Sequence, residues 1–481
     1  MALMKRAYGG VQPCIKLGLL RIRIPFIHFK ISPPEIVTGL MNACTSYGAL
    51  AVLISTLGLD PTVAWALVVF ETSMYTLNWL LGEPSICGWI TPAMAIMIVF
   101  LETLEPGVAR IQAMTAIELE LGILFLVLGF TGLSKKLNTL VPPGLKAGIV
   151  LGAGVNAVVV RLKVGGPIDT VTWGCLAGLL VVFTLMFSQR VRKHMESSRV
   201  IQILGNYSFL WAVFALFIVG GIAGEFDFNF SGEIFRAPDF GALFVTVSPF
   251  FIGWAEPSMW LMAAPYALTA WIIAYGDFVT VQQLGLQATR DDEYIEFDPN
   301  RTNVICGFRN VLLALFAPYP ALAGPLSAPY CVATYQRYKQ SGRQGMDSIY
   351  DGSGTNLIFT VIGLFVYPLY EASLAASAAL LVVVLLIQGY VCALIAFDLV
   401  RDDLDKGMTG MMAGFIIARG AAQGLGASIA LYLLLSDNDK IREDYAYNKE
   451  KQRIEDEETE RQLQALHERM EAFKRGEAVE D

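Results

Sequence analysis

Almost the whole chain up to residue 435 consists of apolar runs of about 16–25 residues, the length of helices that cross a lipid bilayer. In lipid only helices and closed barrels satisfy every backbone hydrogen bond, and the runs are continuous rather than alternating, which favours helices. Charged residues make up 16% of the chain, below the roughly 25% of a soluble protein. The sequence therefore predicts an all-α integral membrane protein.

The apolar runs fall into two sets of seven, so we expect about fourteen transmembrane segments, with boundaries uncertain by about 2–4 residues. The first set lies at 35–58, 61–82, 88–103, 110–133, 143–160, 168–188 and 206–224. The second set lies at 260–287, 302–317, 327–338, 354–369, 372–398, 407–418 and 420–436. The expected domains are a basic N-terminal arm, two seven-span repeats that flank a loop, and a charged tail: 1–34, 35–224, 225–259, 260–436 and 437–481.

The distribution of charge between the spans predicts the orientation. Basic residues concentrate in cytoplasmic loops of membrane proteins. With fourteen spans and a cytoplasmic arm, five basic loops fall inside: 135–136, 190–193, 290–301, 337–343 and 401–406. Arg161 and Lys163 are exceptions to the pattern. We therefore expect a cell-membrane protein with an extracytoplasmic 225–259 loop and both termini in the cytoplasm, the tail forming an amphipathic helix from Leu463, Leu466, Met470 and Phe473.

Two apolar spans are interrupted by the same pattern of helix breakers. They read GEPSICGWITPAM (82–94) and YPALAGPLSAPYC (319–331). Proline precedes glycine by four positions in both, at Pro84 and Gly88 and at Pro320 and Gly324, and a hydroxyl residue follows glycine by three. Each lies at the start of the third span of its set, which indicates an internal repeat. Because each set has an odd number of spans, the second copy enters the membrane from the opposite side.

This pattern predicts two short strands and two half-helices near the middle of the bilayer. Residues 83–90 and 319–326 should be extended, because proline removes a backbone donor and glycine disfavours the helix. Such backbone survives at membrane depth only inside protein or beside a cavity, where the two strands can pair. Half-helices starting near Thr91 and Ser327 would then present two positive N-termini to one place. That arrangement suits an anion or a neutral solute rich in acceptors.

Four stretches resemble the superfamily of nucleobase/ascorbate transporters and sulfate permeases, whose fold is that of the uracil permeases. They are LNTLVPPGLKAGIVLGAGVNA (137–157), PSICGWITPAM, FAPYPALAGPLSAP and GDFVTVQQ (276–283). The resemblance implies seven-plus-seven inverted repeats, broken third and tenth helices, and a core domain of helices 1–4 and 8–11. The remaining helices form a gate domain, against which the core moves in an elevator or rocking motion.

The chain departs from both branches of this superfamily. Nucleobase transporters usually carry a second glutamate on the tenth helix, near the position of Leu326. Sulfate permeases carry a basic residue where this chain has Ala328, and commonly end in a globular STAS domain, for which this tail is too short and too charged. The branch therefore stays open.

The substrate site is expected between the two broken segments, at Gly88, Trp89, Ile90, Thr91, Gly324, Leu326 and Ser327. Trp89 either stacks on a planar substrate or packs in the core. Asp277 lies in the middle of the eighth span, where an aspartate is costly and marks a functional site. It is the candidate carrier of a coupling proton or, with Thr280, of Na⁺; Glu71 is the next candidate.

Three other polar residues inside spans receive structural interpretations. We expect Glu118 at a solvated helix end, Arg309 beside a carboxylate, and Asn156 in a bond between helices. The glycines of the last two spans suggest close packing there: Gly407, Gly410, Gly414, Gly420 and Gly424.

These features favour a secondary active transporter for a small anionic or acceptor-rich solute, coupled to H⁺ or Na⁺. An anion channel or sensor on the same fold is the alternative, followed by an intramembrane enzyme. No GxxxxGK[ST], HExxH or GxSxG motif occurs in the sequence, so we expect neither an enzyme nor a cofactor. The expected partners are a small-molecule substrate, H⁺ or Na⁺, membrane lipid and, as one option, a second copy in a homodimer, without nucleic acid.

Overall fold

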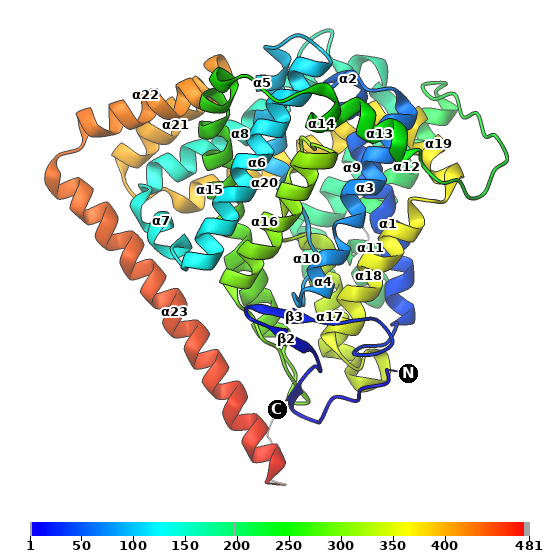
Figure 1. Cartoon of the computed structure of the whole chain (residues 1–481), viewed down its shortest axis with the longest axis vertical. Coiled ribbons are helices and arrows are strands. Elements are labelled where there is room, and N and C mark those ends of the chain that lie inside the picture. The colour runs from blue at the N-terminus through cyan, green and yellow to red at the C-terminus, as the bar shows by residue number, and fades with distance from the viewer. Residues whose placement is uncertain (1, 196–197, 207, 476–481) are drawn as a thin grey trace.

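The computed structural model describes residues 2–195, 198–206 and 208–475, which form a bundle of helices with short paired strands (Figure 1). The strands are β1 (Gly10–Val11), β2 (Ile15–Leu17), β3 (Leu20–Ile22), β4 (Gly88–Trp89), β5 (Glu293–Tyr294) and β6 (Ala323–Gly324). β1 pairs in parallel with β5, β2 forms a hairpin with β3, and β4 pairs antiparallel with β6.

The first half of the described chain contributes fourteen helical segments. They are α1 (Pro33–Ser46), η1 (Tyr47–Ala49), α2 (Leu50–Ser55), α3 (Pro61–Ser73), α4 (Thr76–Leu80), α5 (Thr91–Glu102), α6 (Val108–Thr131), α7 (Ser134–Leu140), α8 (Pro143–Leu162), η2 (Pro167–Thr170), α9 (Thr172–Phe187), α10 (Gln189–Met195), α11 (Arg199–Asn206) and α12 (Ser208–Ile222). Several begin with proline, whose missing N–H costs nothing in the first turn.

The second half repeats the alternation of long and broken helices. Its helices are α13 (Phe240–Val247), α14 (Pro249–Ile252), α15 (Pro257–Ala288), α16 (Pro299–Phe316), α17 (Ala328–Gly345), α18 (Ile349–Gly363), α19 (Tyr367–Ala375), α20 (Ser377–Leu399), α21 (Asp403–Arg419), α22 (Ala421–Leu435) and α23 (Asn438–Lys474). Where one span was expected at 372–398, the chain instead forms α19 and then α20, with a break at Ala376.

Five helices of the described chain are long and apolar enough to cross a membrane unaided: 33–55, 108–131, 143–162, 257–288 and 377–399. The other spans are shorter, as in α9 and α12, broken, as in β4–α5 and β6–α17, or carry charges, as in α16. The architecture confirms the all-α membrane fold with two inverted seven-span repeats.

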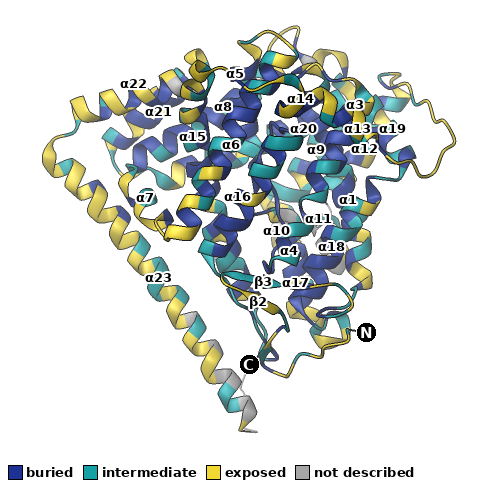
Figure 2. Ribbon diagram, viewed as in Figure 1, coloured by how far each residue is buried: buried dark blue, intermediate teal, exposed yellow. Residues whose placement is uncertain are grey.

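The helices pack as two groups. In the core group, α6 packs against α15 and α16, and α1 packs against α18. In the gate group, α8 packs against α20 and α21, and α9 against α12. Buried residues concentrate along these contacts (Figure 2). The α6–α16 contact requires glycine: a Cβ at Gly129 would lie 2.7 Å from Cγ2 of Val304, and one at Gly122 would lie 2.8 Å from Cγ2 of Val311.

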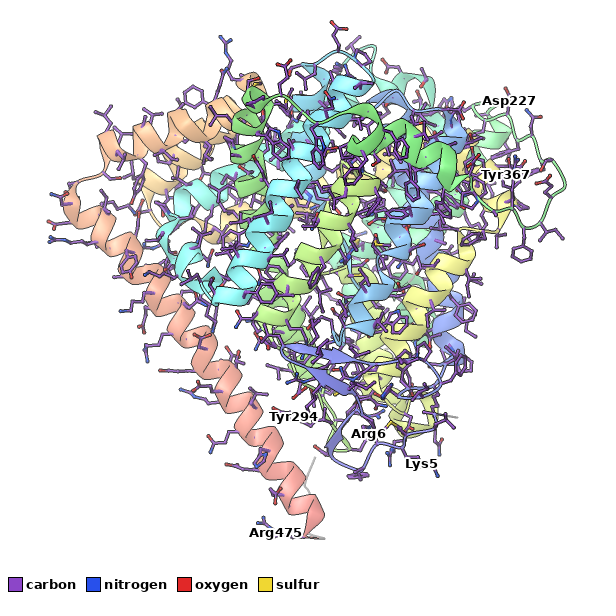
Figure 3. The ribbon with its side chains drawn as sticks, in the orientation of Figure 1. Lys5, Arg6, Asp227, Tyr294, Tyr367 and Arg475 are labelled. Atoms are coloured by element: carbon purple, nitrogen blue, oxygen red, sulfur yellow. The ribbon has the colours of Figure 1, made fainter. Side chains whose placement is uncertain are left out.

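The N-terminal arm is fastened to the bundle rather than free. Gly10 pairs with Glu293 in the β1–β5 ladder, and Arg6 donates to the carbonyl oxygen of Asp347 at 2.8 Å. Figure 3 shows Arg6 and Tyr294 at the same end of the molecule, and Asp227 and Tyr367 at the other.

The helix of the tail, α23, spans Asn438–Lys474, so it contains the 463–473 stretch predicted from the apolar spacing and extends well before it. The expected close packing of glycines holds at only part of the predicted positions. Close packing holds at Gly424, where an added Cβ would lie 2.7 Å from Cγ1 of Ile416. A Cβ at Gly407, Gly410 or Gly414 would meet no described atom within 4 Å, so these glycines face open space.

Candidate substrate site

The two broken segments cross at the centre of the site. β4 and β6 pair antiparallel, with Gly88 opposite Gly324 and Trp89 opposite Ala323. Two further backbone bonds extend the crossing: Ile90 N–H donates to the carbonyl oxygen of Ala321 at 3.1 Å, and Ser327 N–H donates to that of Ile86 at 2.8 Å. The predicted pairing of the two segments is therefore confirmed.

A half-helix leaves the crossing on each side. α5 begins at Thr91, and α17 begins at Ala328 with Ser327 as its N-cap, as the sequence predicted. Neither N-terminus receives a side-chain cap hydrogen bond. The N–H of Ala93 donates to the carbonyl oxygen of Ile90 at 2.9 Å, and each helix has a proline, without an N–H, in its first turn. The positive helix ends therefore mark the site more than a set of free N–H groups does. Because the strands are antiparallel, the helices run in opposite directions and both positive ends lie at the crossing.

Glycine is required on both strands by the closeness of the crossing. A Cβ on Gly88 would lie 3.0 Å from Cβ of Ser327, and one on Gly324 would lie 2.9 Å from the carbonyl carbon of Trp89. Nearby, Leu322 has a left-handed backbone with φ of 56°, which is rare for a branched residue. Strained backbone of this kind concentrates at binding sites.

Two neighbouring residues of α16 hold the crossing from behind. Arg309 Nη1 donates to the carbonyl oxygen of Gly324 at 2.8 Å, and Nη2 to that of Gly88 at 3.5 Å. Asn310 donates to the carbonyl oxygen of Ala323 at 2.9 Å and accepts that residue's N–H at 3.0 Å. Among the described residues Arg309 forms no direct ion pair, although the carboxylate of Glu71 interacts with its charge.

Glu118 corrects another expectation. Its side chain is fully buried, and Oε2 accepts the backbone N–H of Tyr319 at 2.8 Å, just before β6. It is therefore a support of the site and not a solvated helix end. Asn156, as expected, bonds between helices: its Nδ2 donates to the carbonyl oxygen of Ala95 at 3.3 Å.

The remaining predicted substrate residues differ in their accessibility. Thr91 and Ser327 keep partial exposure, and Ala328 is exposed although it opens a helix inside the bundle. Ile90 is buried, and Leu326 retains only 7% exposure within an apolar cluster. The Trp89 ring packs 6.0 Å from that of Tyr319, centroid to centroid. The hydroxyl residues and helix ends therefore offer the accessible surface, whereas Leu326 contributes packing.

The candidate coupling residues occupy two places. Asp277 is partly exposed and Thr280 is exposed, both on α15, which packs against α17. The Thr280 hydroxyl donates to the carbonyl oxygen of Gly276 on its own helix at 2.9 Å. Glu71 is instead fully buried on α3, with Thr72 donating to its Oε2 at 3.2 Å. In the described chain, no group of three or more His, Cys, Asp or Glu residues is arranged to hold a metal ion.

The fold and the crossing together define a class: membrane proteins of two inverted seven-span repeats with broken third and tenth helices. SLC26A9 shares this fold, with a TM-score of 0.51 and 13% identity over 84% of this chain and 64% of that one. The matched region thus spans less than two thirds of that protein. This likeness confirms the fold that the resemblance to the nucleobase and sulfate permease superfamily predicted.

Two further structures align less closely. The transmembrane domain of a cyanobacterium bicarbonate transporter, BicA, matches with a TM-score of 0.45 and 15% identity over 82% of this chain and 97% of that one. Murine Slc26a9, described as an anion transporter in the inward-facing state, matches with a TM-score of 0.45 and 13% identity over 84% and 68%. No family model matches the sequence. No curated protein matches it either.

Sequence reasoning missed the supporting roles of Glu118, Arg309 and Asn310. Each is a polar residue inside an apolar span, which is the one signal that marks it. Their partners are backbone groups of the broken segments, and nothing in the local sequence names such partners.

Proposed function

We propose that this protein is a secondary active transporter for a small anionic or acceptor-rich solute. The observation that carries the proposal is the crossing of β4 and β6, at which two uncapped half-helix N-termini meet. The positive ends of helices favour anions. The substrate would lie between residues 88–91 and 324–327, with the hydroxyls of Thr91 and Ser327 in reach.

The charge of Arg309 supports the anionic reading over the neutral one. Its guanidinium is fully buried and bonds to the carbonyl oxygens of both strand glycines, so it places a positive charge directly behind the crossing. Coulomb attraction to this guanidinium lowers the cost of bringing an anion nearby. Sulfate-type and carboxylate-type anions are therefore favoured over a nucleobase-like compound.

We further propose that transport is coupled to H⁺ or Na⁺ through Asp277, with Thr280 and Glu71 as additional candidates. Asp277 lies about two thirds of the way along the 32-residue α15, and its partial exposure supports access by a coupling ion. The proposed orientation has both termini in the cytoplasm and the 225–259 loop outside, and the proposed domains are the five divisions expected from the sequence. Reporter fusions after Lys30 and at Asp481 test that orientation.

Uptake into proteoliposomes tests the transporter proposal. A thermal-shift screen with sulfate, bicarbonate, small carboxylates and nucleobases first selects the solute, and radiolabelled uptake of it then follows. Saturation and counterflow are the expected results. A conductance without counterflow would support the channel alternative, and the absence of both would contradict transport of the chosen solute.

A further inference from the structure

A cluster of three buried charged groups lies behind the crossing, on three different helices. Glu71 on α3, Glu118 on α6 and Arg309 on α16 are all fully buried. The guanidinium of Arg309 lies 5.1 Å from the centre of the Tyr75 ring, four positions along the chain from Glu71. Arg309 and Glu118 both bind backbone of the same broken segment, at Gly324 and Tyr319. Within the described chain, no direct ion pair joins any two of these three residues. The three charges are therefore neighbours that share one low-dielectric region.

Four polar atoms in this cluster lack hydrogen-bond partners within the described chain: Glu71 Oε1, Glu118 Oε1, Arg309 Nε and the hydroxyl oxygen of Tyr319. Tyr319 is itself fully buried and interacts electrostatically with both carboxylates. Buried polar atoms are almost always satisfied, and exceptions point to water, an ion or a functional role. Four such atoms in one region make this cluster a candidate place for binding a proton.

The charge of the cluster identifies what it binds. Two carboxylates and one guanidinium leave one negative charge uncompensated, and an uncompensated buried charge takes up a proton. The other titratable groups that interact with these three residues are Tyr75, Tyr319, Cys87 and Cys306, all neutral near pH 7. One proton on the carboxylate pair therefore makes the cluster neutral. A second proton balances an anion that approaches Arg309.

We propose that Glu71 and Glu118 form a proton-binding pair that is balanced by Arg309, and that one proton accompanies each monovalent anion entering the crossing. This inference rests on the proposed function, because it assigns the coupling ion. The pair is attached to the substrate site through backbone: Glu118 holds the N–H of Tyr319, and Arg309 holds the carbonyl oxygens of Gly88 and Gly324. A proton on the pair therefore changes the charge directly behind both half-helix N-termini.

Infrared spectroscopy of the purified protein tests the shared proton without any substrate. The absorption of protonated carboxyl groups is compared near pH 7 between the wild type, Glu71→Gln, Glu118→Gln and the double variant. The Glu118→Gln change keeps a side-chain oxygen for the Tyr319 N–H, and thermal unfolding verifies that each variant is folded. Glu105→Gln, at an exposed position in the loop before α6, is the control.

If the two carboxyl groups share one proton, each single variant should lose the absorption of one protonated carboxyl. The double variant should lose the same amount and no more. In a single variant the remaining carboxylate is balanced by Arg309 and stays ionised. A double variant that loses the absorption of two protonated carboxyl groups would overturn the proposal of one shared proton. An absorption that is unchanged in all three variants would overturn it as well. Glu105→Gln should leave this absorption unchanged.

Transport assays then separate this inference from the proposed function. In proteoliposomes, an inward proton gradient should accelerate wild-type uptake of the solute chosen by thermal shift. The double variant Glu71→Gln with Glu118→Gln has no carboxyl left in the cluster to take up a proton, so it should lose most of that acceleration and retain exchange. Gradient-driven uptake that survives in the double variant would overturn the coupling role. If wild-type protein transports none of the tested solutes, the proposed function fails, while the infrared result still decides whether the pair shares a proton.

A second, independent observation concerns α23, which runs along one side of the bundle (Figure 1). Four of its residues, spaced by four and thus on one face, contact the rest of the protein. Asp444 accepts from Arg401 at 3.0 Å and from Tyr432 at 2.7 Å. Asn448 donates to the carbonyl oxygens of Thr139 and Val141, at 3.1 and 2.9 Å. Gln452 donates to the Tyr275 hydroxyl at 3.2 Å. Asp456 forms an ion pair with Lys135.

These contacts connect parts that must move relative to each other in an elevator mechanism. The Asp444 contacts belong to the gate group, beside α21 and α22, whereas Tyr275 belongs to α15 of the core group. Between Gln452 and Asp456 on one side and Tyr275, Gln282 and Asn303 on the other lies a cavity of about 350 Å³. We infer that α23 is a latch that restrains the core group against the gate group.

A reversible cross-link tests the latch. Lys135→Cys with Asp456→Cys, bridged by a reducible bifunctional thiol reagent, should show a lower initial uptake rate, and reduction should restore that rate. Asp456→Ala should raise the rate by about two- to fivefold, the range expected for removing a partly exposed ion pair. Glu450→Ala, at an exposed position of α23, is the control. Equal initial uptake rates of the cross-linked and the reduced cysteine pair would contradict the proposal that α23 is a latch.

Discussion

Gly88 lies directly opposite Gly324 in the antiparallel pair of β4 and β6, and neither position has room for a side chain. The two residues come from segments more than two hundred positions apart, yet each limits how closely the other's strand can approach. This relationship makes the crossing sensitive to a single methyl group, because the obstacles are largely backbone atoms that cannot turn aside.

Gly88→Ala and Gly324→Ala should each reduce uptake at least tenfold and destabilise the protein by about 1–3 kcal/mol, the usual cost of overpacking. The larger Gly88→Val and Gly324→Val should abolish uptake while protein remains in the membrane. Gly414→Ala is the matched control, since a Cβ there meets no described atom within 4 Å. Uptake at the wild-type level in both valine variants would show that the break is only a kink.

Asn310→Ala should destabilise the site more than a typical polar deletion. It removes both hydrogen bonds to Ala323, at 2.9 and 3.0 Å, and leaves a buried carbonyl and a buried N–H without that partner. The expected loss is about 2–4 kcal/mol, since each unsatisfied group costs roughly 1–3 kcal/mol. Thermal unfolding measures the loss. Asn156→Ala, which breaks one longer bond between helices, should cost less, and the reverse order would contradict a clamp at Asn310.

The buried pair of Arg301 and Glu83 should affect stability without affecting substrate choice. Arg301 Nε lies 2.7 Å from Glu83 Oε1, and Thr302 donates to the other carboxylate oxygen at 2.8 Å. Arg301→Met leaves an uncompensated buried carboxylate and should cost about 3–5 kcal/mol. The double variant Arg301→Met with Glu83→Gln should recover part of that loss. Competition assays on the double variant should return the wild-type order of solutes.

Asp277→Asn tests the coupling role that the sequence assigned to α15. If Asp277 carries the coupling proton, the variant mimics its permanently protonated form, and concentrative uptake should vanish while exchange of solute survives. If the residue holds Na⁺, sodium-dependent binding should disappear as well. Proteoliposomes with imposed proton or sodium gradients provide the measurement, with Thr280→Ala assayed in parallel. Unchanged gradient-driven accumulation would remove Asp277 from the mechanism and leave the Glu71–Glu118 pair as the coupling site.

The sequence by itself determined the broken helices and the places where they restart. Proline lacks an N–H and glycine disfavours the helix, so the breaks at Pro84 and Pro320 follow from local chemistry. Duplication of the pattern at corresponding spans then predicted the pairing of the two strands, because extended backbone in a membrane requires a partner. Because these helix breakers fix where each break ends, α5 and α17 begin within a residue of the predicted positions.

Only the tertiary structure decided what surrounds the crossing. The sequence predicted Glu118 at a solvated helix end and Arg309 beside a carboxylate. In the structure, both side chains instead bind backbone groups of the broken segments. Those partners are 201 residues away for Glu118 and 15 residues away for Arg309, beyond the reach of any helical periodicity. Apolar spans look alike from all sides in sequence, since lipid and protein interior are both apolar. The direction in which a buried polar side chain points is therefore set by the packing of neighbouring helices.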